Sequence, residues 1–195
     1  MKTIFSQSTD PYFNLAWEEY IFKNIECQED ILLLWQNEPS VIIGRNQIVF
    51  EEVSVEYAKK HQIPIIRRIS GGGTVYHDLG NLNFSVITNN YKDAISNYKY
   101  FTEPIIHCLN ELKVDAHLSG RSDICIQDQK ISGNAQSYYQ NRMLHHGTIL
   151  FSSDLKHLNK IIKKPSKDFE SFGVKSNRSK VTKCRRLFIN SDENR

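Results

Sequence analysis

Three consecutive glycines follow a pair of arginines at residues 67–78, where the sequence is RRISGGGTVYHD. Glycine has no Cβ, so a bend of this composition leaves its backbone N–H groups open to the close approach of a phosphate. Arg67 and Arg68 could add charge-assisted, bidentate contacts to the same anion. The spacing fits neither the P-loop G-x-x-x-x-G-K-[ST] nor the dinucleotide-binding fingerprint. From the residues alone, the segment is either a phosphate-binding loop or an ordinary tight turn.

The hydrophobic pattern on either side predicts short strands and helices that would position this segment. Strands are expected at residues 31–35, 41–43, 65–69, 74–76, 83–88, 123–127, 130–135 and 148–151, with a hairpin turning at Asp128-Gln129. Helices are expected at residues 11–25, 53–61, 98–112 and 155–162. Because strands and helices do not alternate regularly, the pattern predicts an α+β fold rather than a doubly wound sheet.

The first predicted helix has a recognisable beginning. Asp10 is suited to the N-cap and Pro11 to the first helical position. A stripe of apolar residues follows at helical spacing, and we expect it to face the core: Phe13, Ala16, Trp17, Tyr20 and Ile21.

Composition favours a soluble, cytoplasmic protein with one domain. No apolar run reaches the ~20 residues that a membrane helix needs. Residues 17–19 (WEE) place charge where a secretory signal would have its apolar core. Cys27, Cys108, Cys125 and Cys184 are scattered, without a C-x-x-C pair, which favours free thiols in a reducing compartment.

Charge is distributed unevenly along the chain. Residues 156–186 hold 11 Lys/Arg against two Asp/Glu, a local charge of +9, whereas residues 1–155 hold 13 Lys/Arg against 18 Asp/Glu, a local charge of −5. The basic stretch could be a docking surface for an acidic partner or simply a solvated face. It has few interleaved aromatic residues and no nucleic-acid-reading motif, so nucleic acid is not an expected partner.

Two histidine positions raise the question of a metal site. His145 and His146 are adjacent, but neighbouring residues on a strand point to opposite faces, so their rings could not easily share one ion. We therefore expect no dedicated protein site for a metal. His77 is either a hydrogen-bonded structural histidine or a ligand contact.

Four segments, taken in order, resemble the lipoate–protein ligase family. They are residues 14–19 (NLAWEE), residues 41–47 (VIIGRNQ), residues 67–84 (RRISGGGTVYHDLGNLNF), and a region made of residues 120–124 (GRSDI), 130–135 (KISGNA) and 145–148 (HHGT). Composition does not explain four motifs in the family's order. The chain is therefore identified as a member of that family over about residues 14–181.

The resemblance implies the α+β catalytic-domain fold shared by biotin and lipoate ligases, with a mixed, mainly antiparallel sheet flanked by helices. It gives Lys130 the catalytic role, in contact with the acyl carboxylate and the α-phosphate, where an ammonium would stabilise negative charge. The residues implied in ATP or phosphate binding are Arg67, Arg68, Gly71, Gly72, Gly73, Thr74, Val75, Asp123 and Lys130. The residues implied in lipoate binding are Gly44, Arg45, Asn46, His77, Lys130, Ser132, Gly133 and His146. Asp123 is either a magnesium or lysine contact or a solvent-facing aspartate, and Mg²⁺ would be held mainly through the phosphates.

The implied reaction has two steps. Lipoate or octanoate reacts with ATP to give acyl-AMP, and the acyl group then passes to a lysine of a lipoyl domain. The implied acceptors are E2 subunits of 2-oxo acid dehydrogenases or the glycine cleavage H protein. Two alternatives stay open: a transferase that needs preformed lipoyl-AMP, and a non-catalytic fragment that binds the adenylate or the lipoyl domain.

Octanoyltransferases that use acyl carrier protein share the fold but need a reactive cysteine thiolate. Lys175-Ser176-Asn177 stands where their cysteine is expected, so the ligase reaction is preferred. The likeness to the family ends near Thr182. We therefore expect a catalytic domain over residues 1–182, incomplete at its C-terminal end, and a divergent tail over residues 183–195. The small accessory domain of many relatives is expected to be absent or to be a separate chain.

Overall fold

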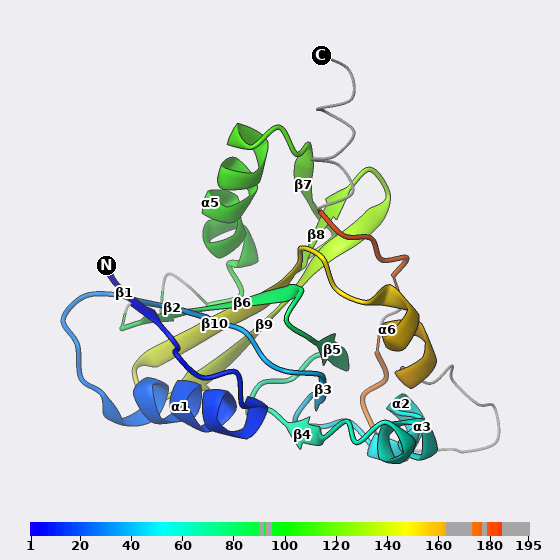
Figure 1. Cartoon of the computed structure of the whole chain (residues 1–195). Helices are drawn as coiled ribbons and strands as arrows, with labels where there is room; N and C mark the ends of the chain where they lie inside the picture. Colours follow the sequence, from blue (N-terminus) through cyan, green and yellow to red (C-terminus); the bar gives the residue numbers. More distant parts are fainter. Residues whose placement is uncertain (90–91, 93–94, 163–172, 177–178, 185–195) are drawn as a thin grey trace.

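A seven-stranded sheet forms the centre of the computed structural model, which describes residues 1–89, 92, 95–162, 173–176 and 179–184 (Figure 1). The strand order is β1 (Lys2–Phe5), β2 (Ile31–Trp35), β6 (Asn81–Thr88), β10 (Arg142–Leu150), β9 (Gln129–Tyr139), β8 (Asp123–Ile126) and β7 (Ala116–Ser119). β1 runs parallel to β2, and the other neighbouring strands are antiparallel. The predicted α+β fold with a mixed, mainly antiparallel sheet is therefore confirmed.

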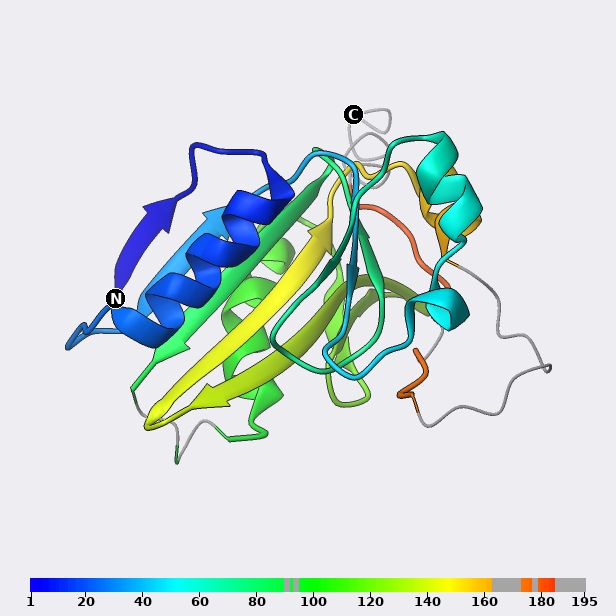
Figure 2. The same ribbon diagram turned by 90° about the horizontal axis from the view of Figure 1, so that it is seen from below.

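Two long helices cover opposite faces of this sheet. α1 (Pro11–Asn24) lies on one side and α5 (Tyr98–Glu111) on the other, as Figures 1 and 2 show from two directions. Phe22 of α1 is buried with Leu144 of β10, whereas Phe101 of α5 is buried with Met143, the preceding residue of the same strand. Adjacent strand residues point to opposite faces, so the sheet separates two cores.

A second, three-stranded sheet carries the glycine run. Its order is β4 (Ile65–Arg67), β3 (Ser40–Ile43) and β5 (Val75–His77), with β3 parallel to β4 and antiparallel to β5. The short helices α2 (Val49–Glu52), α3 (Val55–Lys60) and α6 (Leu155–Ile161) lie beside it (Figure 1). Val41 and Ile43 are buried with Ala58 and Ile161. The glycine run thus connects the two outer strands of a packed sheet.

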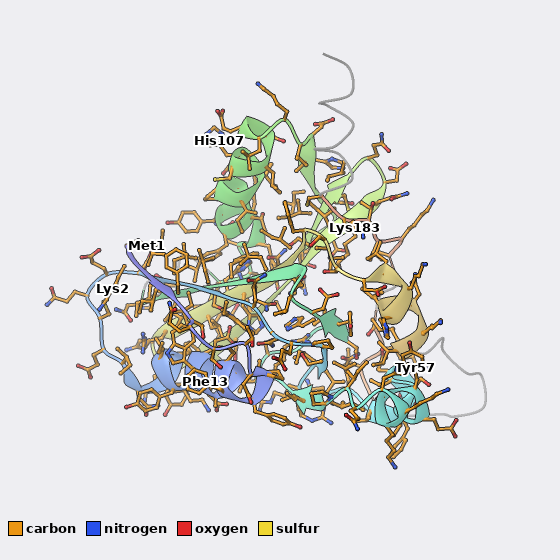
Figure 3. All side chains as sticks on the ribbon, in the orientation of Figure 1. Met1, Lys2, Phe13, Tyr57, His107 and Lys183 are labelled. Atoms are coloured by element: carbon orange, nitrogen blue, oxygen red, sulfur yellow. The ribbon has the colours of Figure 1, made fainter. Side chains whose placement is uncertain are left out.

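Helix α1 buries a different face from the one predicted. Of the five stripe residues, only Ile21 is buried and Trp17 partly buried, whereas Phe13 and Tyr20 are 53% and 58% exposed. Figure 3 draws the described side chains and labels Phe13 on α1. The buried face instead carries the polar Asn14 and Glu18. A buried polar residue is stable only with hydrogen-bond partners, which the helical pattern cannot reveal.

Most of the other predicted elements are confirmed to within a few residues. Asp10 caps α1, accepting a hydrogen bond from the Phe13 N–H at 2.8 Å, and Pro11 is its first residue. The sequence did not predict β1, α2 or β7, and β10 begins six residues earlier than expected. The hairpin turns at residues 127–128, with Gln127 at φ 51°, one residue before the predicted turn. Among the described helices, none combines the length and the apolar composition that a membrane span requires.

The C-terminal part of the described chain packs on the domain beyond residue 182. Cys184 is fully buried in the core beside α5, and its N–H donates to the Leu150 carbonyl at 2.9 Å. Residues 185–195, most of the segment predicted as a divergent tail, lie outside the described residues. The same holds for 14 of the 31 residues in the basic stretch at 156–186, namely 163–172, 177–178 and 185–186.

Candidate active site

A cleft of about 790 Å³ is lined by the glycine run together with β9 and β10. Eleven of the 16 predicted site residues line it: Arg68, Gly71, Gly72, Gly73, Thr74, Val75, His77, Asp123, Lys130, Gly133 and His146. The other five do not: Gly44, Arg45, Asn46, Arg67 and Ser132. The structure therefore brings the glycine run and the predicted catalytic lysine to one cavity, although they are far apart in the sequence.

Lys130 is held firmly at the start of β9. Its ammonium Nζ lies 2.9 Å from Asp123 Oδ1 on the neighbouring strand, and its side chain is 22% exposed. Its N–H donates to the Lys180 carbonyl at 2.8 Å, and its carbonyl accepts from the Thr182 N–H at 3.0 Å. Gly133 provides space, because a Cβ there would lie 2.9 Å from Lys130 Nζ. Lys130 is thus a preorganised cation on a rigid element.

The shape of the glycine run depends on close backbone packing. Gly72 has φ +90°, a conformation that side-chain-bearing residues rarely adopt. A Cβ on Gly44 would lie 2.1 Å from the Gly72 carbonyl oxygen, so the loop after β3 supports the run directly. On the other side, the Thr74 N–H donates to Ser176 Oγ at 2.9 Å, and that hydroxyl donates to Glu52 Oε2 at 2.5 Å.

Arg68 is buried under the glycine run rather than extended toward solvent. Its Nε donates to Ser70 Oγ at 3.0 Å, and its Nη1 to the Ile42 carbonyl at 3.2 Å. Its Nη2 donates to the carbonyls of Gly71 and Gly73 at 2.6 and 2.7 Å. Burial lowers the pKa of Arg68 to about 10. Four of the five guanidinium N–H groups are therefore used to hold the loop.

Arg67, the other arginine predicted to lie near phosphate, is not among the residues that line the cleft. Its Nη1 donates to the carbonyls of Gly44, Arg45 and Gln47 at 2.9, 3.0 and 2.8 Å. Arg45 and Asn46 are exposed on that loop. Arg67 therefore holds the loop after β3, and neither it nor Arg45 and Asn46 belongs to the cleft wall.

The two histidines of β10 point to opposite faces, as predicted. His145 stacks on Phe101 with ring centres 4.6 Å apart, on the α5 side of the sheet. His146 lies on the α1 side, with Nδ1 2.9 Å from Glu18 Oε1. His77 lines the cleft from β5, with Nδ1 3.1 Å from the Asn37 side-chain nitrogen, and its buried Nε2 has no hydrogen-bond partner among the described residues.

We expect the free energy of unfolding to fall by about 2 kcal/mol between about pH 6 and pH 5 because of His77 and His145. Burial lowers the pKa of each to about 3, and the positive charge of Arg68 adds to the lowering at His77. In the unfolded chain both would titrate near 6.5. The unfolded state then binds more protons in this window, so stability is lost as the pH falls. Urea unfolding at the two pH values measures the change. His145→Gln should remove about half of it, and an unaltered pH dependence in that variant would contradict the assignment.

The cysteines do not provide a reactive thiolate at this site. All four are free, as predicted. Burial raises the pKa of Cys125, and it raises that of Cys184 to about 11. A raised pKa keeps a thiol protonated and unreactive. Ser176 occupies the edge of the cleft near the glycine run, so the chemistry of a cysteine nucleophile is not favoured.

Several cleft residues were not singled out from the sequence. Arg121 is one of them: its guanidinium lies 5.2 Å from the centre of the Tyr98 ring, in a cation–π contact on the cleft wall. Trp35, Asn134 and Gln136 also line the cleft. Arg121 belongs to the matched segment 120–124, but its spacing does not distinguish it from a solvated arginine.

Within the described residues, no group of three or more His, Cys, Asp or Glu side chains could hold a metal. Among the described residues that line the cleft, Asp123 is the single acidic one. Mg²⁺ commonly keeps several waters and binds through one or two carboxylates plus substrate phosphates. The donor set therefore fits a magnesium ion that arrives with a nucleotide.

The α+β domain that holds the glycine-rich loop and the strand-held lysine at one cleft has the fold of the biotin/lipoate ligase catalytic domain. The sequence model described as lipoyl protein ligase A/B catalytic domain matches residues 10–193, and the chain belongs to that family. One relative is the lipoate–protein ligase LplJ of Bacillus subtilis, 48% identical over 172 residues, which cover 88% of this chain and 52% of the relative. The chain spans about half the length of the curated relatives it matches.

Solved structures show the same fold. A bi-partite lipoate protein ligase from Thermoplasma acidophilum, described with its E2 lipoyl domain, has a TM-score of 0.77 and 33% identity, covering 86% of this chain and 68% of its own. A lipoate–protein ligase A bound with ATP has a TM-score of 0.75 and 26% identity, covering 100% and 94%. The predicted family and fold are confirmed.

Proposed function

We propose that this chain carries the activity of a lipoate–protein ligase. Lipoate or octanoate would react with ATP to form acyl-AMP and release pyrophosphate, and the acyl group would then pass to a lysine of a lipoyl domain. The observation that carries the proposal is the Lys130 ammonium, fixed by two strands in the same cleft as the glycine run. Relatives named as lipoate–protein ligases and an ATP-bound ligase of the same fold support it.

Different residues of the cleft would contribute to the first step, the formation of acyl-AMP. Attack by the carboxylate on the α-phosphate increases negative charge at the reacting oxygens, and the Lys130 ammonium would stabilise that charge. The backbone of residues 71–75 would lie along the phosphates. Asp123 pairs with Lys130 at 2.9 Å, and would orient it or share the magnesium that accompanies ATP. The acyl chain would occupy the part of the cleft lined by Leu15, Trp35 and Ile42.

In the second step, the acceptor lysine would attack the carbonyl carbon of acyl-AMP, forming an amide and releasing AMP. The proposed acceptors are lipoyl domains of E2 subunits or the glycine cleavage H protein. The archaeal ligase described with its E2 lipoyl domain supports the first of these.

We expect the purified chain, given ATP, Mg²⁺ and lipoate, to increase the mass of a purified lipoyl domain by one lipoyl group. Intact-mass spectrometry measures the product, and ATP–pyrophosphate exchange without acceptor measures adenylation. Transfer from supplied lipoyl-AMP without exchange would instead identify a transferase that needs the preformed adenylate. Binding of lipoyl-AMP without either reaction would identify a non-catalytic domain. A lipoyl domain whose acceptor lysine is replaced by arginine is the matched control.

A further inference from the structure

A continuous line of buried polar groups connects helix α1 to the glycine run. Glu18 Oε1 lies 2.9 Å from His146 Nδ1, and His146 Nε2 lies 2.6 Å from Ser70 Oγ. Ser70 Oγ accepts from Arg68 Nε at 3.0 Å. Glu18 and Ser70 are each 1% exposed, and His146 and Arg68 each 8%. Arg68 in turn holds the carbonyls of the run.

The hydrogen bonds of this line have one consistent direction. A carboxylate at Glu18 only accepts, and Oε1 receives both the Ser85 hydroxyl and His146 Nδ1–H. His146 with its proton on Nδ1 accepts at Nε2, which requires the Ser70 hydroxyl to donate there. The remaining Ser70 lone pairs can then accept from Arg68 Nε. Each hydrogen bond is therefore donated in the same direction along the line, from Arg68 toward Glu18.

The two charges at the ends of the line depend on each other. None of the four acceptors on the Arg68 guanidinium is a carboxylate. An unpaired charge in the interior is costly, so a buried guanidinium needs an anion that acts at a distance or through a relay. The Glu18 charge raises the pKa of Arg68 against the larger lowering by burial, in agreement with this compensation.

Ser70, His146 and Glu18 also have the order and spacing of a hydrolytic serine–histidine–acid triad. Ser70 is a poor nucleophile here, because it is buried, is absent from the cleft wall and already accepts from Arg68. The arrangement is better suited to positioning than to covalent catalysis.

We propose that Glu18 is a positioning residue that acts through His146, Ser70 and Arg68 to hold the glycine run in the conformation that receives the nucleotide. α1 thereby contributes to the nucleotide side of the cleft without touching the nucleotide. The identity of the ligand rests on the proposed function, whereas the effect on the loop does not.

The test compares Glu18→Gln with Glu19→Gln. Glu19 is the next residue of α1, makes a surface pair with Lys23 at 2.5 Å and undergoes the same change of charge. In the nucleotide-free protein, amide hydrogen exchange at residues 70–75 should become at least about tenfold faster in Glu18→Gln, with exchange in β7 unaltered. The dissociation constant for a non-hydrolysable ATP analogue should rise about tenfold. Glu19→Gln should match the wild type in both measurements.

Ser70→Ala provides a second, independent variant that interrupts the middle of the line. It should accelerate loop exchange by itself, and Glu18→Gln should then add less than about twofold, because coupled groups are not additive. Unaltered loop exchange in Ser70→Ala, or full additivity of the two changes, would overturn the relay. If Glu18→Gln does not fold, loop exchange in Ser70→Ala alone tests the proposal. If the wild type binds no ATP analogue while the exchange results hold, the proposed function fails and the relay stands.

Discussion

Lys130→Ala is expected to lower the rate of acyl-adenylate formation by at least about a hundredfold, which is the usual cost of removing a preorganised charge at the reacting atoms. The protein should still fold, because the side chain is 22% exposed and Asp123, 24% exposed, can be hydrated once its partner is gone. ATP–pyrophosphate exchange at saturating ATP and lipoate measures the effect on the first step.

Two further variants define the control for this experiment. Lys60→Ala removes an exposed lysine at the end of α3 and should leave the rate unchanged. Lys130→Arg restores the positive charge but not the compact ammonium, so it should recover only part of the rate. Near-normal exchange by a folded Lys130→Ala protein would exclude this lysine from the mechanism.

The parts of the cleft that could be predicted are those that depend on local sequence. The glycine run and the hairpin lysine stand in continuous motifs, so their positions on a loop and on a strand follow from neighbouring residues. The opposite orientations of His145 and His146 follow from the strand period alone. These features needed no knowledge of which segments meet in space.

The roles of the two arginines show where that reasoning ends. Arg67 and Arg68 are the same residue type at adjacent positions, yet one supports the loop after β3 and the other lies buried beneath the glycine run. The difference depends on which carbonyls lack donors after the sheet has formed. The spacing of residues in the sequence does not indicate which carbonyls these are.

Long-range pairing explains the error in α1. Glu18 and His146 are 128 residues apart, and their contact requires the polar face of α1 to turn inward. The apolar stripe was predicted from hydrophobic spacing, which assumes that polar side chains have no partners in the core. β1 was missed for a related reason: it is a short edge strand, largely exposed, with no alternation of buried and exposed residues.

Gly72→Ala is expected to weaken binding of an ATP analogue by at least about tenfold and to lower the free energy of unfolding by about 1–2 kcal/mol. The backbone has φ +90° there, and an added Cβ would lie 2.9 Å from Arg68 Nη2, the nitrogen that holds the run. The substitution therefore strains the backbone and displaces its support together. Urea unfolding and isothermal titration calorimetry measure the two effects separately.

Gly71→Ala is the matched control, since a Cβ there would meet nothing within 4 Å and the backbone is not in the left-handed region. It should unfold within about 0.5 kcal/mol of the wild type. If it nevertheless weakens nucleotide binding, the methyl group lies where the ligand approaches, because no strain accompanies it. If Gly72→Ala loses stability but keeps full nucleotide affinity, the run is a structural turn, and the phosphates are held by cations that line the cleft, such as Lys130, Arg121 and Lys175.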